Sequence, residues 1–251
     1  TNWQEWEKLL LSADEYSFLQ SWQMGELSKQ IGNEVLRFRF DYQDKPMLLA
    51  QISIISAKRG KLFQLRHAPI FLPDFIRSNE KAKESAIHEF LSQLVSMAKK
   101  EKCDYLRLQP LLRTKYQENS EPEDNEVQPS ESKVNTEVTD GFLSAAKSCG
   151  FRPANIHNID AEKTLILNIT LPEESILQAM RKQTRYYIRR AEKDGVSVTS
   201  AKDLDAVNEF YKIHHDTTVR QKFTSYSLEF YQKFVSALNS IPESQLSAEV
   251  L

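Results

Sequence analysis

Residues 171–198 read LPEESILQAMRKQTRYYIRRAEKDGVSV and contain the signals of a capped helix followed by a strand. Pro172 suits the first helical position, two glutamates follow in the first turn where the helix dipole favours anions, and Gly195 is a typical end signal. The pattern therefore predicts one helix from about 172 to 194 and a strand over 196–200.

This helix is predicted to have two different faces. Apolar and small residues recur every three or four positions and predict a buried stripe: Leu177, Met180, Thr184, Tyr187, Ile188 and Ala191. The cations fall on another face: Lys182, Arg185, Arg189 and Lys193, with Arg190 at the border. Guanidinium groups suit phosphate, since each can donate two parallel hydrogen bonds. The alternative is an ordinary solvated helix face.

Composition indicates a globular protein of more than average domain size. The chain has 251 residues, 40% of them hydrophobic and 27% charged, with a formal net charge of −2, so any nucleic-acid contact must be local. No secretory signal or membrane-spanning run is recognisable, which predicts a cytoplasmic protein. Cys103 and Cys149 are expected to be free thiols, and the five histidines form no zinc motif.

The first half alternates helical and strand patterns. Helices are predicted over 3–11, 20–31 and 80–102, and strands over 35–42, 47–56, 62–68 and 105–109, with turns at Lys45-Pro46 and Arg59-Gly60. This is an α/β (α+β) pattern of a mixed sheet flanked by helices. Residues 114–140 are acidic and poor in apolar side chains, and they are expected to form a mobile surface loop.

The second half repeats this order loosely. A helix is predicted over 141–149, a strand over 164–169, then the basic helix and its strand, helices over 203–218 and 228–238, and a strand over 246–251. We expect a first lobe over 1–158 and the N-terminal part of a second, incomplete lobe over 159–251.

Five motifs in the same order resemble the FemABX group of peptidoglycan-bridge aminoacyltransferases. They are Phe18–Trp22 with Gly25 and Gly32, the strand Leu106–Gln109 before Pro110, Gly150–Ala154 with 164–167, the stretch from Lys182 to Val196, and Arg220–Phe223 with Tyr226 and Tyr231. The resemblance implies two acetyltransferase-like (GNAT) lobes. One departure is Arg66-His67-Ala68-Pro69, where many relatives have Arg-Gly-Pro.

The resemblance also implies a reaction. An aminoacyl-tRNA would donate its aminoacyl group to an amine on the peptide of a cell-wall precursor, without a metal or other cofactor. The acceptor would be the UDP-linked muropeptide or its lipid-linked form, and the latter would bring the protein to the inner face of the membrane. Both substrates carry phosphates, which fits a local cationic surface on a chain of near-neutral charge.

Substrate-binding candidates follow from both arguments. The phosphate contacts are assigned first to Arg185 and Arg189, then to Lys182, Arg190, Lys193 and Arg220, and the further candidates are Lys29, Gln20, Trp22, Gln109 and Tyr226. Each also has a purely structural explanation, as core, strand end or solvated surface. No catalytic base is assigned, because Asp216 and Glu229 do not differ from surface acids.

Two other classes of function stay open. An acyl-CoA-dependent N-acyltransferase could use the same kind of lobe, although the six glycines are not clustered as a pyrophosphate loop would need. A non-catalytic remnant of a transferase that binds an anionic ligand is the third possibility.

Overall fold

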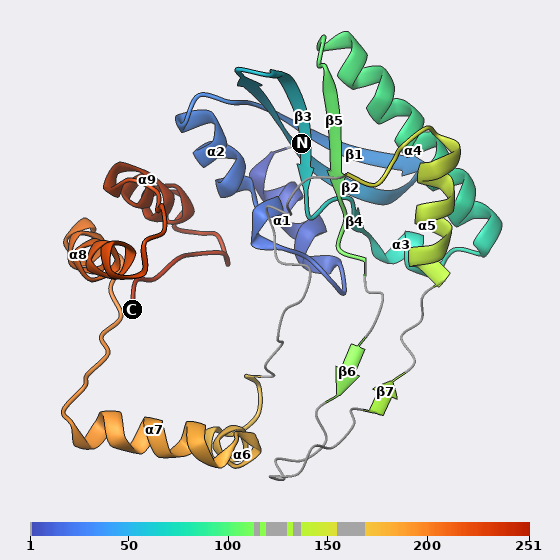
Figure 1. Cartoon of the computed structure of the whole chain (residues 1–251). Coiled ribbons are helices and arrows are strands. Elements are labelled where there is room, and N and C mark those ends of the chain that lie inside the picture. Colours follow the sequence, from blue (N-terminus) through green and yellow to red (C-terminus); the bar gives the residue numbers. More distant parts are fainter. Residues whose placement is uncertain (1, 113–115, 119–129, 133–136, 155–168) are drawn as a thin grey trace.

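The computed structural model describes residues 2–112, 116–118, 130–132, 137–154 and 169–251. It has a mixed α/β fold in which helices flank a five-stranded sheet (Figure 1). The sheet has the order β1-β2-β3-β5, and the short strand β4 (Ile70–Phe71) pairs with β2. The expected mixed sheet is confirmed.

The first three strands form an antiparallel meander, as predicted. They are β1 (Glu34–Tyr42), β2 (Lys45–Ala57) and β3 (Gly60–Arg66). The first turn was predicted two residues too late, because Gln43 and Asp44 have φ of 51° and 60° while Lys45 and Pro46 already belong to β2. Two consecutive positive φ angles match the twist of a tight hairpin.

The core lies between this sheet and the long helix α4 (Glu80–Lys100). Alternation along each strand sends Phe63 and Leu65 to this side, where both are fully buried with Phe90 of α4. After α4 the chain returns as β5 (Tyr105–Gln109), which pairs in parallel with β3. Helices α3 (Pro73–Arg77) and α5 (Glu137–Ser148) complete the first half.

Three N-terminal elements lie near the opposite face of the sheet (Figure 1). They are α1 (Trp3–Ser12), the 3₁₀ turn η1 (Phe18–Gln20) and α2 (Trp22–Gln30). Trp6 and Leu10 of α1 pack with Leu49 in a second apolar cluster. Gly32 ends the α2 region with φ of 93°, as its predicted role requires.

The acidic segment 114–140 is described only in part. Its described strands β6 (Tyr116–Glu118) and β7 (Ser130–Ser132) pair antiparallel, and α5 starts at Glu137, four residues before the predicted start. The strand predicted over 164–169 lies, except for its last residue, outside the described residues. Ile169 belongs to no strand.

The predicted helix over 172–194 is wrong in its continuity. Two helices replace it, α6 (Glu173–Ala179) and α7 (Lys182–Lys193), with extended backbone at Met180 and Arg181. The carbonyls that α6 leaves free at Gln178 and Met180 accept hydrogen bonds from Arg185. No proline or glycine marks the break, so residue type gave no signal for it.

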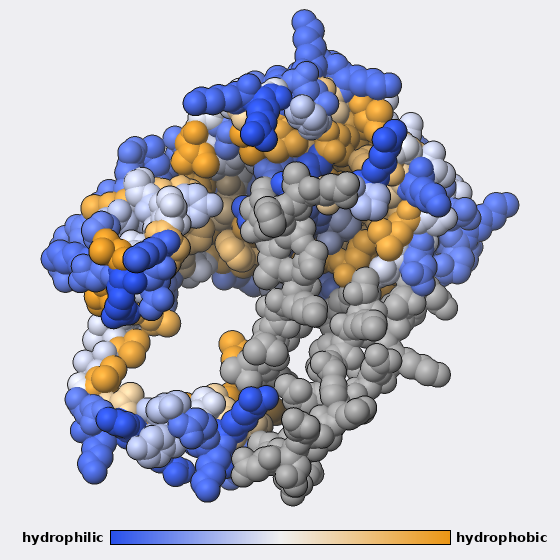
Figure 2. All heavy atoms as spheres, viewed as in Figure 1, coloured by the Kyte–Doolittle hydropathy of each residue, from blue (hydrophilic) through white to orange (hydrophobic). Residues whose placement is uncertain are grey.

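The buried stripe predicted for this segment is wrong as well. Neither α6 nor α7 has a buried residue, and Tyr187 is 58% exposed. Figures 1 and 2 show both helices standing apart from the sheet and from α8 and α9, with hydrophilic side chains along α7. A helix face becomes buried only where another surface packs on it, and no described element does so here.

The last helices follow the predictions closely. They are α8 (Leu204–Gln221), whose N-cap is Asp203, and α9 (Leu228–Leu238). The strands predicted over 196–200 and 246–251 are wrong, since the described backbone there forms only an isolated bridge between Ala201 and Val250. A strand forms where a neighbouring strand pairs with it over several residues. The described backbone here makes one such pairing, the bridge between Ala201 and Val250.

Helix α9 packs on α2 and so joins the two halves of the chain. Among the described helices, none combines the length and the apolar character that crossing a membrane requires.

Candidate functional site

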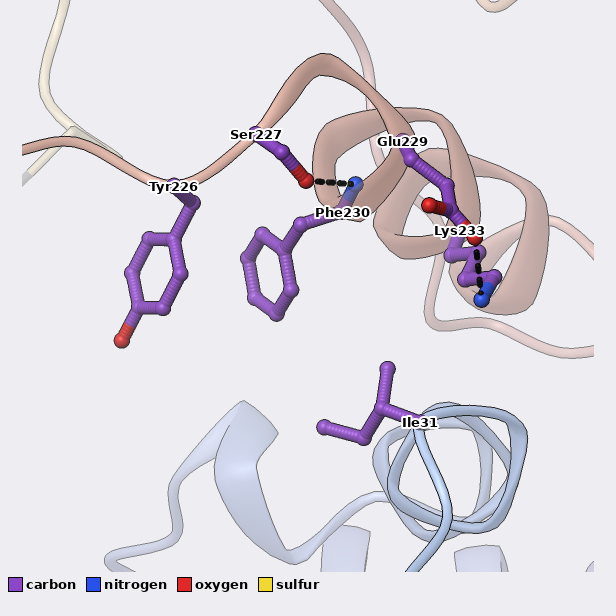
Figure 3. Close-up of a pocket in the computed structure, with 6 residues that line it drawn as sticks. All are labelled: Ile31, Tyr226, Ser227, Glu229, Phe230 and Lys233. Carbon is purple, nitrogen blue, oxygen red and sulfur yellow. Dashed lines mark hydrogen bonds and ion pairs between the residues drawn. The ribbon is translucent and has the colours of Figure 1, made fainter.

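A cavity of about 310 Å³ lies where the start of α9 faces the end of α2. We call it the α9 cavity, and Figure 3 shows its lining residues: Ile31, Tyr226, Ser227, Glu229, Phe230 and Lys233. Ile31 caps the end of α2, and the other five come from α9 and the two residues that precede it. The cavity therefore depends on the packing of α9 against α2.

Two aromatic rings form one wall of the α9 cavity. Tyr226 and Phe230 stack with ring centroids 4.1 Å apart and an interplanar angle of 19°, and Phe230 lies on the side nearer to Ile31 (Figure 3). Ser227 caps α9 by accepting a hydrogen bond from the backbone N–H of Phe230, which explains why the helix begins here. Tyr226 is 62% exposed, so its ring is available to a ligand.

The opposite side of the α9 cavity is charged. Lys233 and Glu229, one helical turn apart, form an ion pair with 2.7 Å between nitrogen and oxygen. The hydrogen bond from Lys233 holds the pKa of Glu229 below its ordinary value. Glu229 is therefore a poorer proton acceptor than an ordinary glutamate, and nothing in this geometry favours it as a base.

Gln20 lies in the interior instead of facing a cleft. It is 1% exposed, and its side-chain nitrogen donates to the backbone oxygens of Gln51 and Arg66 at 3.2 and 2.7 Å. Its side-chain oxygen accepts from the backbone N–H of Gln51 at 2.6 Å. These contacts join β2 and β3 just beyond their last paired residues, Ser53 and Gln64. The geometry gives Gln20 a structural position, because its amide has no remaining group for a ligand.

Trp22 also packs against protein. The guanidinium of Arg37 lies 3.5 Å from the centroid of its ring and donates a hydrogen bond to its backbone oxygen at 2.9 Å. Arg37 further donates to Gln51 and to Glu26, and its side chain is only 10% exposed. This is a cation–π contact inside an α2–β1–β2 polar cluster.

Lys29 takes part in the same cluster. It forms an ion pair with Glu26 at 2.9 Å, while Arg37 binds the same carboxylate at 2.8 Å. Burial opposes the ionisation of Glu26, but the hydrogen bonds from Lys29 and Arg37 outweigh it, and the pKa of Glu26 lies below its ordinary value. The ionised form of Glu26 therefore stabilises the folded protein at pH values above the ordinary pKa of a glutamate. This contribution to stability is lost as the pH falls through the lowered pKa.

The cations of α7 are not equally available. The guanidinium of Arg185 donates hydrogen bonds to backbone oxygens at the end of α6. Arg190 forms an ion pair with Asp194 at 3.3 Å. Lys182, Arg189 and Lys193 are exposed, and no hydrogen bond or ion pair joins their side chains to the described residues. Within the described part of the chain, these three positive charges are unpaired and face solvent.

The other candidates are dispersed. Arg220 lies exposed in the last turn of α8. Gln109 ends β5, and its side-chain oxygen is buried without a hydrogen-bond partner. Of the eleven predicted binding residues, only Tyr226 lines the α9 cavity, and helix α7 stands apart from α9 (Figure 1).

The prediction missed the other residues that line the α9 cavity. The spacing of Tyr226 and Phe230, one helical turn apart across the capping Ser227, was a usable signal. No sequence signal indicated that Ile31 lines the cavity, because its contribution depends on the packing of α2 against α9. Within the described part of the chain, no three His, Cys, Asp or Glu side chains gather as metal ligands would.

Comparisons with known proteins identify the family. The FemAB family profile matches residues 2–240, which is nearly the whole chain. The chain belongs to the FemAB family. A comparison with curated proteins finds no match.

A solved structure, the crystal structure of FemX, shares the fold of this FemAB chain. The TM-score is 0.66 at 17% sequence identity, and the match covers 96% of this chain. It covers 54% of the FemX chain, so this FemAB sequence spans about half the length of that structure. The likeness establishes the fold, and it leaves the reaction to be proposed.

Proposed function

We propose that this protein transfers an aminoacyl group from an aminoacyl-tRNA to an amine on the peptide of a peptidoglycan precursor, in the cytoplasm. The observation that carries this proposal is the FemAB family match over residues 2–240. The shared fold with FemX supports it. The expected two-lobe organisation, divided near residue 158, belongs to the same proposal.

The α9 cavity is the proposed site for the nucleotide of a UDP-linked acceptor. An exposed tyrosine stacked on Phe230 offers a flat surface for a pyrimidine ring, and base–aromatic stacking contributes about 1–3 kcal/mol per base. The N-terminal end of α9 adds positive potential beside that surface, while the charge of Lys233 is offset by its ion pair with Glu229. Tyr226 is thus retained from the sequence candidates as a direct ligand contact.

The exposed cations of α7 are proposed to contact substrate phosphate. Lys182, Arg189 and Lys193 are the strongest of these candidates, because their charges are uncommitted. Arg185 is a weaker choice than the sequence suggested, since its guanidinium caps α6. Gln109 and Arg220 stay as secondary candidates, Gln109 because its buried oxygen lacks a hydrogen-bond donor.

Replacing Arg189 and Lys193 together with alanine tests the phosphate contact. We expect weaker binding of a UDP-muropeptide or an aminoacyl-tRNA, with a shallower dependence of affinity on salt, because fewer counterions are displaced. Calorimetric titration at several salt concentrations measures both effects. The matched control is Lys212→Ala, an exposed lysine of α8 that pairs with Glu209. Unchanged titrations for both ligands would refute the contact.

Product mass tests the reaction itself. The complete protein is incubated with charged tRNA and UDP-muropeptide, and the muropeptide is analysed by mass spectrometry. A mass gain equal to one or more aminoacyl residues, dependent on charged tRNA, is expected. A gain that requires acyl-CoA would identify the other class of transferase, and no gain with either donor would leave only a binding role.

A further inference from the structure

Three polar side chains next in sequence to the lining of the α9 cavity, or on the neighbouring helix α8, lie within hydrogen-bond distance of one another, and we call this group the triangle. The Nε2 atom of His214 lies 2.6 Å from the hydroxyl of Ser225 and 3.2 Å from the hydroxyl of Tyr231. The two hydroxyls lie 3.1 Å from each other. One imidazole nitrogen therefore ties α8, the loop before α9, and α9 itself together.

Aromatic rings hold the imidazole of His214 in this orientation. Phe210, one turn earlier on α8, stacks on it with centroids 5.4 Å apart and an interplanar angle of 9°. The rings of Phe223 and Tyr231 meet it edge-on at 5.9 and 5.6 Å. A part-buried polar group inside an aromatic cluster makes hydrogen bonds that are costly to lose.

The triangle is connected directly to the aromatic wall of the cavity. Ser225 immediately precedes Tyr226, and Tyr231 immediately follows Phe230. The loop between α8 and α9 begins at Lys222, which ends α8 in a left-handed conformation with φ of 54°. Besides the triangle, the described contacts of this loop include the stacking of Tyr226 on Phe230, the edge contacts of Phe223 with His214 and of Tyr226 with Tyr231, and the cap made by Ser227.

We propose that His214 is a positioning residue that, through Ser225 and Tyr231, holds the Tyr226–Phe230 wall in the geometry that receives a planar ring. This inference rests on the proposed function, since the planar ring is the base of the nucleotide-linked acceptor. His214 does not line the cavity, so it acts on the ligand only through the loop and the start of α9.

Three substitutions remove the hydrogen bonds while preserving shape. His214→Phe keeps a ring in the aromatic cluster, Tyr231→Phe deletes only a hydroxyl, and Ser225→Ala deletes the other. Each is expected to weaken UDP binding to the complete protein about five- to tenfold, which is the effect of losing about one net hydrogen bond. His214→Gln, whose side-chain oxygen can accept near the position of Nε2, should restore most of the affinity.

Matched controls separate this role from general destabilisation. Tyr211→Phe removes a tyrosine hydroxyl on α8, and Thr224→Ala removes a hydroxyl next to Ser225, and neither hydroxyl bonds to a described residue. Both controls should bind UDP as the unaltered protein does. Hydrogen exchange of the amides in residues 222–227 should accelerate in the three test variants and stay unchanged in the controls.

The two measurements distinguish this inference from the proposed function. Faster exchange in the loop together with weaker UDP binding supports the positioning role. Unchanged exchange, or faster exchange with unchanged affinity, overturns it. If the unaltered protein binds no UDP, the nucleotide assignment of the cavity fails. The exchange data then decide by themselves whether His214 positions the loop.

Discussion

At the scale of single residues, the partner of a polar side chain depends on the segments that fold around it, as Gln20 and Tyr226 illustrate. Gln20 and Tyr226 were both expected to bind substrate, yet one is buried between two strands and the other is exposed at a cavity. An amide and a phenol can each serve a fold or a ligand equally well. Which partner they find depends on backbone groups that lie far away in the sequence, such as Gln51 for Gln20.

At this scale, Gln20→Ala is expected to destabilise the protein by about 2–4 kcal/mol. The change removes three hydrogen bonds and leaves the backbone N–H of Gln51 and the backbone oxygen of Arg66 without their side-chain partner. Urea unfolding followed by circular dichroism measures the loss. Gln93→Ala, which alters a half-buried glutamine on α4 whose hydrogen bond to Glu89 is solvent-exposed, should change stability by less than about 0.5 kcal/mol. Equal effects for both variants would contradict the structural role of Gln20.

Element prediction succeeded where a segment packs on its neighbours. The strong periodicity of α4 and the apolar runs of β2 and β3 correspond to residues that are buried in the core. It failed for α6 and α7, whose pattern is equally regular but which have no buried residue. A hydrophobic pattern states which face would be buried, and packing decides whether a partner exists.

Two glycine substitutions test the contacts of helical elements. A Cβ at position 25 of α2 would lie 2.2 Å from Oε1 of Gln51 and 2.5 Å from Nη2 of Arg37, so Gly25→Ala should cost about 1–3 kcal/mol. A Cβ at position 141 of α5 meets no atom within 4 Å, so Gly141→Ala should stabilise the protein by about 0.5–1 kcal/mol. Thermal unfolding of the pair provides the measurement. Effects of the same sign would argue against the close approach of α2 to the sheet.

On the scale of the molecule, residues 244–246 connect the second half of the chain to helices α1 and α2 of the first half. Ser244 donates a hydrogen bond to the carboxylate of Glu7 in α1, and it lies 2.6 Å from the side-chain nitrogen of Gln23 in α2. The backbone N–H of Gln245 donates to the same carboxylate at 3.0 Å. Leu246 packs against the second apolar cluster beside these contacts. The α2–α9 packing that creates the cavity is supported at this point.

Ser244→Ala should therefore loosen the attachment of α9. It removes the hydroxyl that bridges Glu7 and Gln23, at an expected cost of about 1–3 kcal/mol because both partners are buried. Hydrogen exchange in α9 should rise more than exchange in α4. Ser240→Ala is the control, since that hydroxyl bonds only to the backbone of Ala237. Uniform changes across both helices would instead indicate a general loss of stability.

The sequence by itself determined the family resemblance, the presence of helices α4, α8 and α9 with the boundaries of α9, and the meander of β1 to β3. These features depend on local patterns of polarity, caps and turn residues, which are written in neighbouring positions. Only the tertiary structure decided that Gln20 joins two strands, that Arg185 caps α6, and that Ile31 and Tyr226 share a cavity. These features depend on which segments, distant in the sequence, pack together. The free energy of that packing is distributed over many contacts that no local sequence pattern contains.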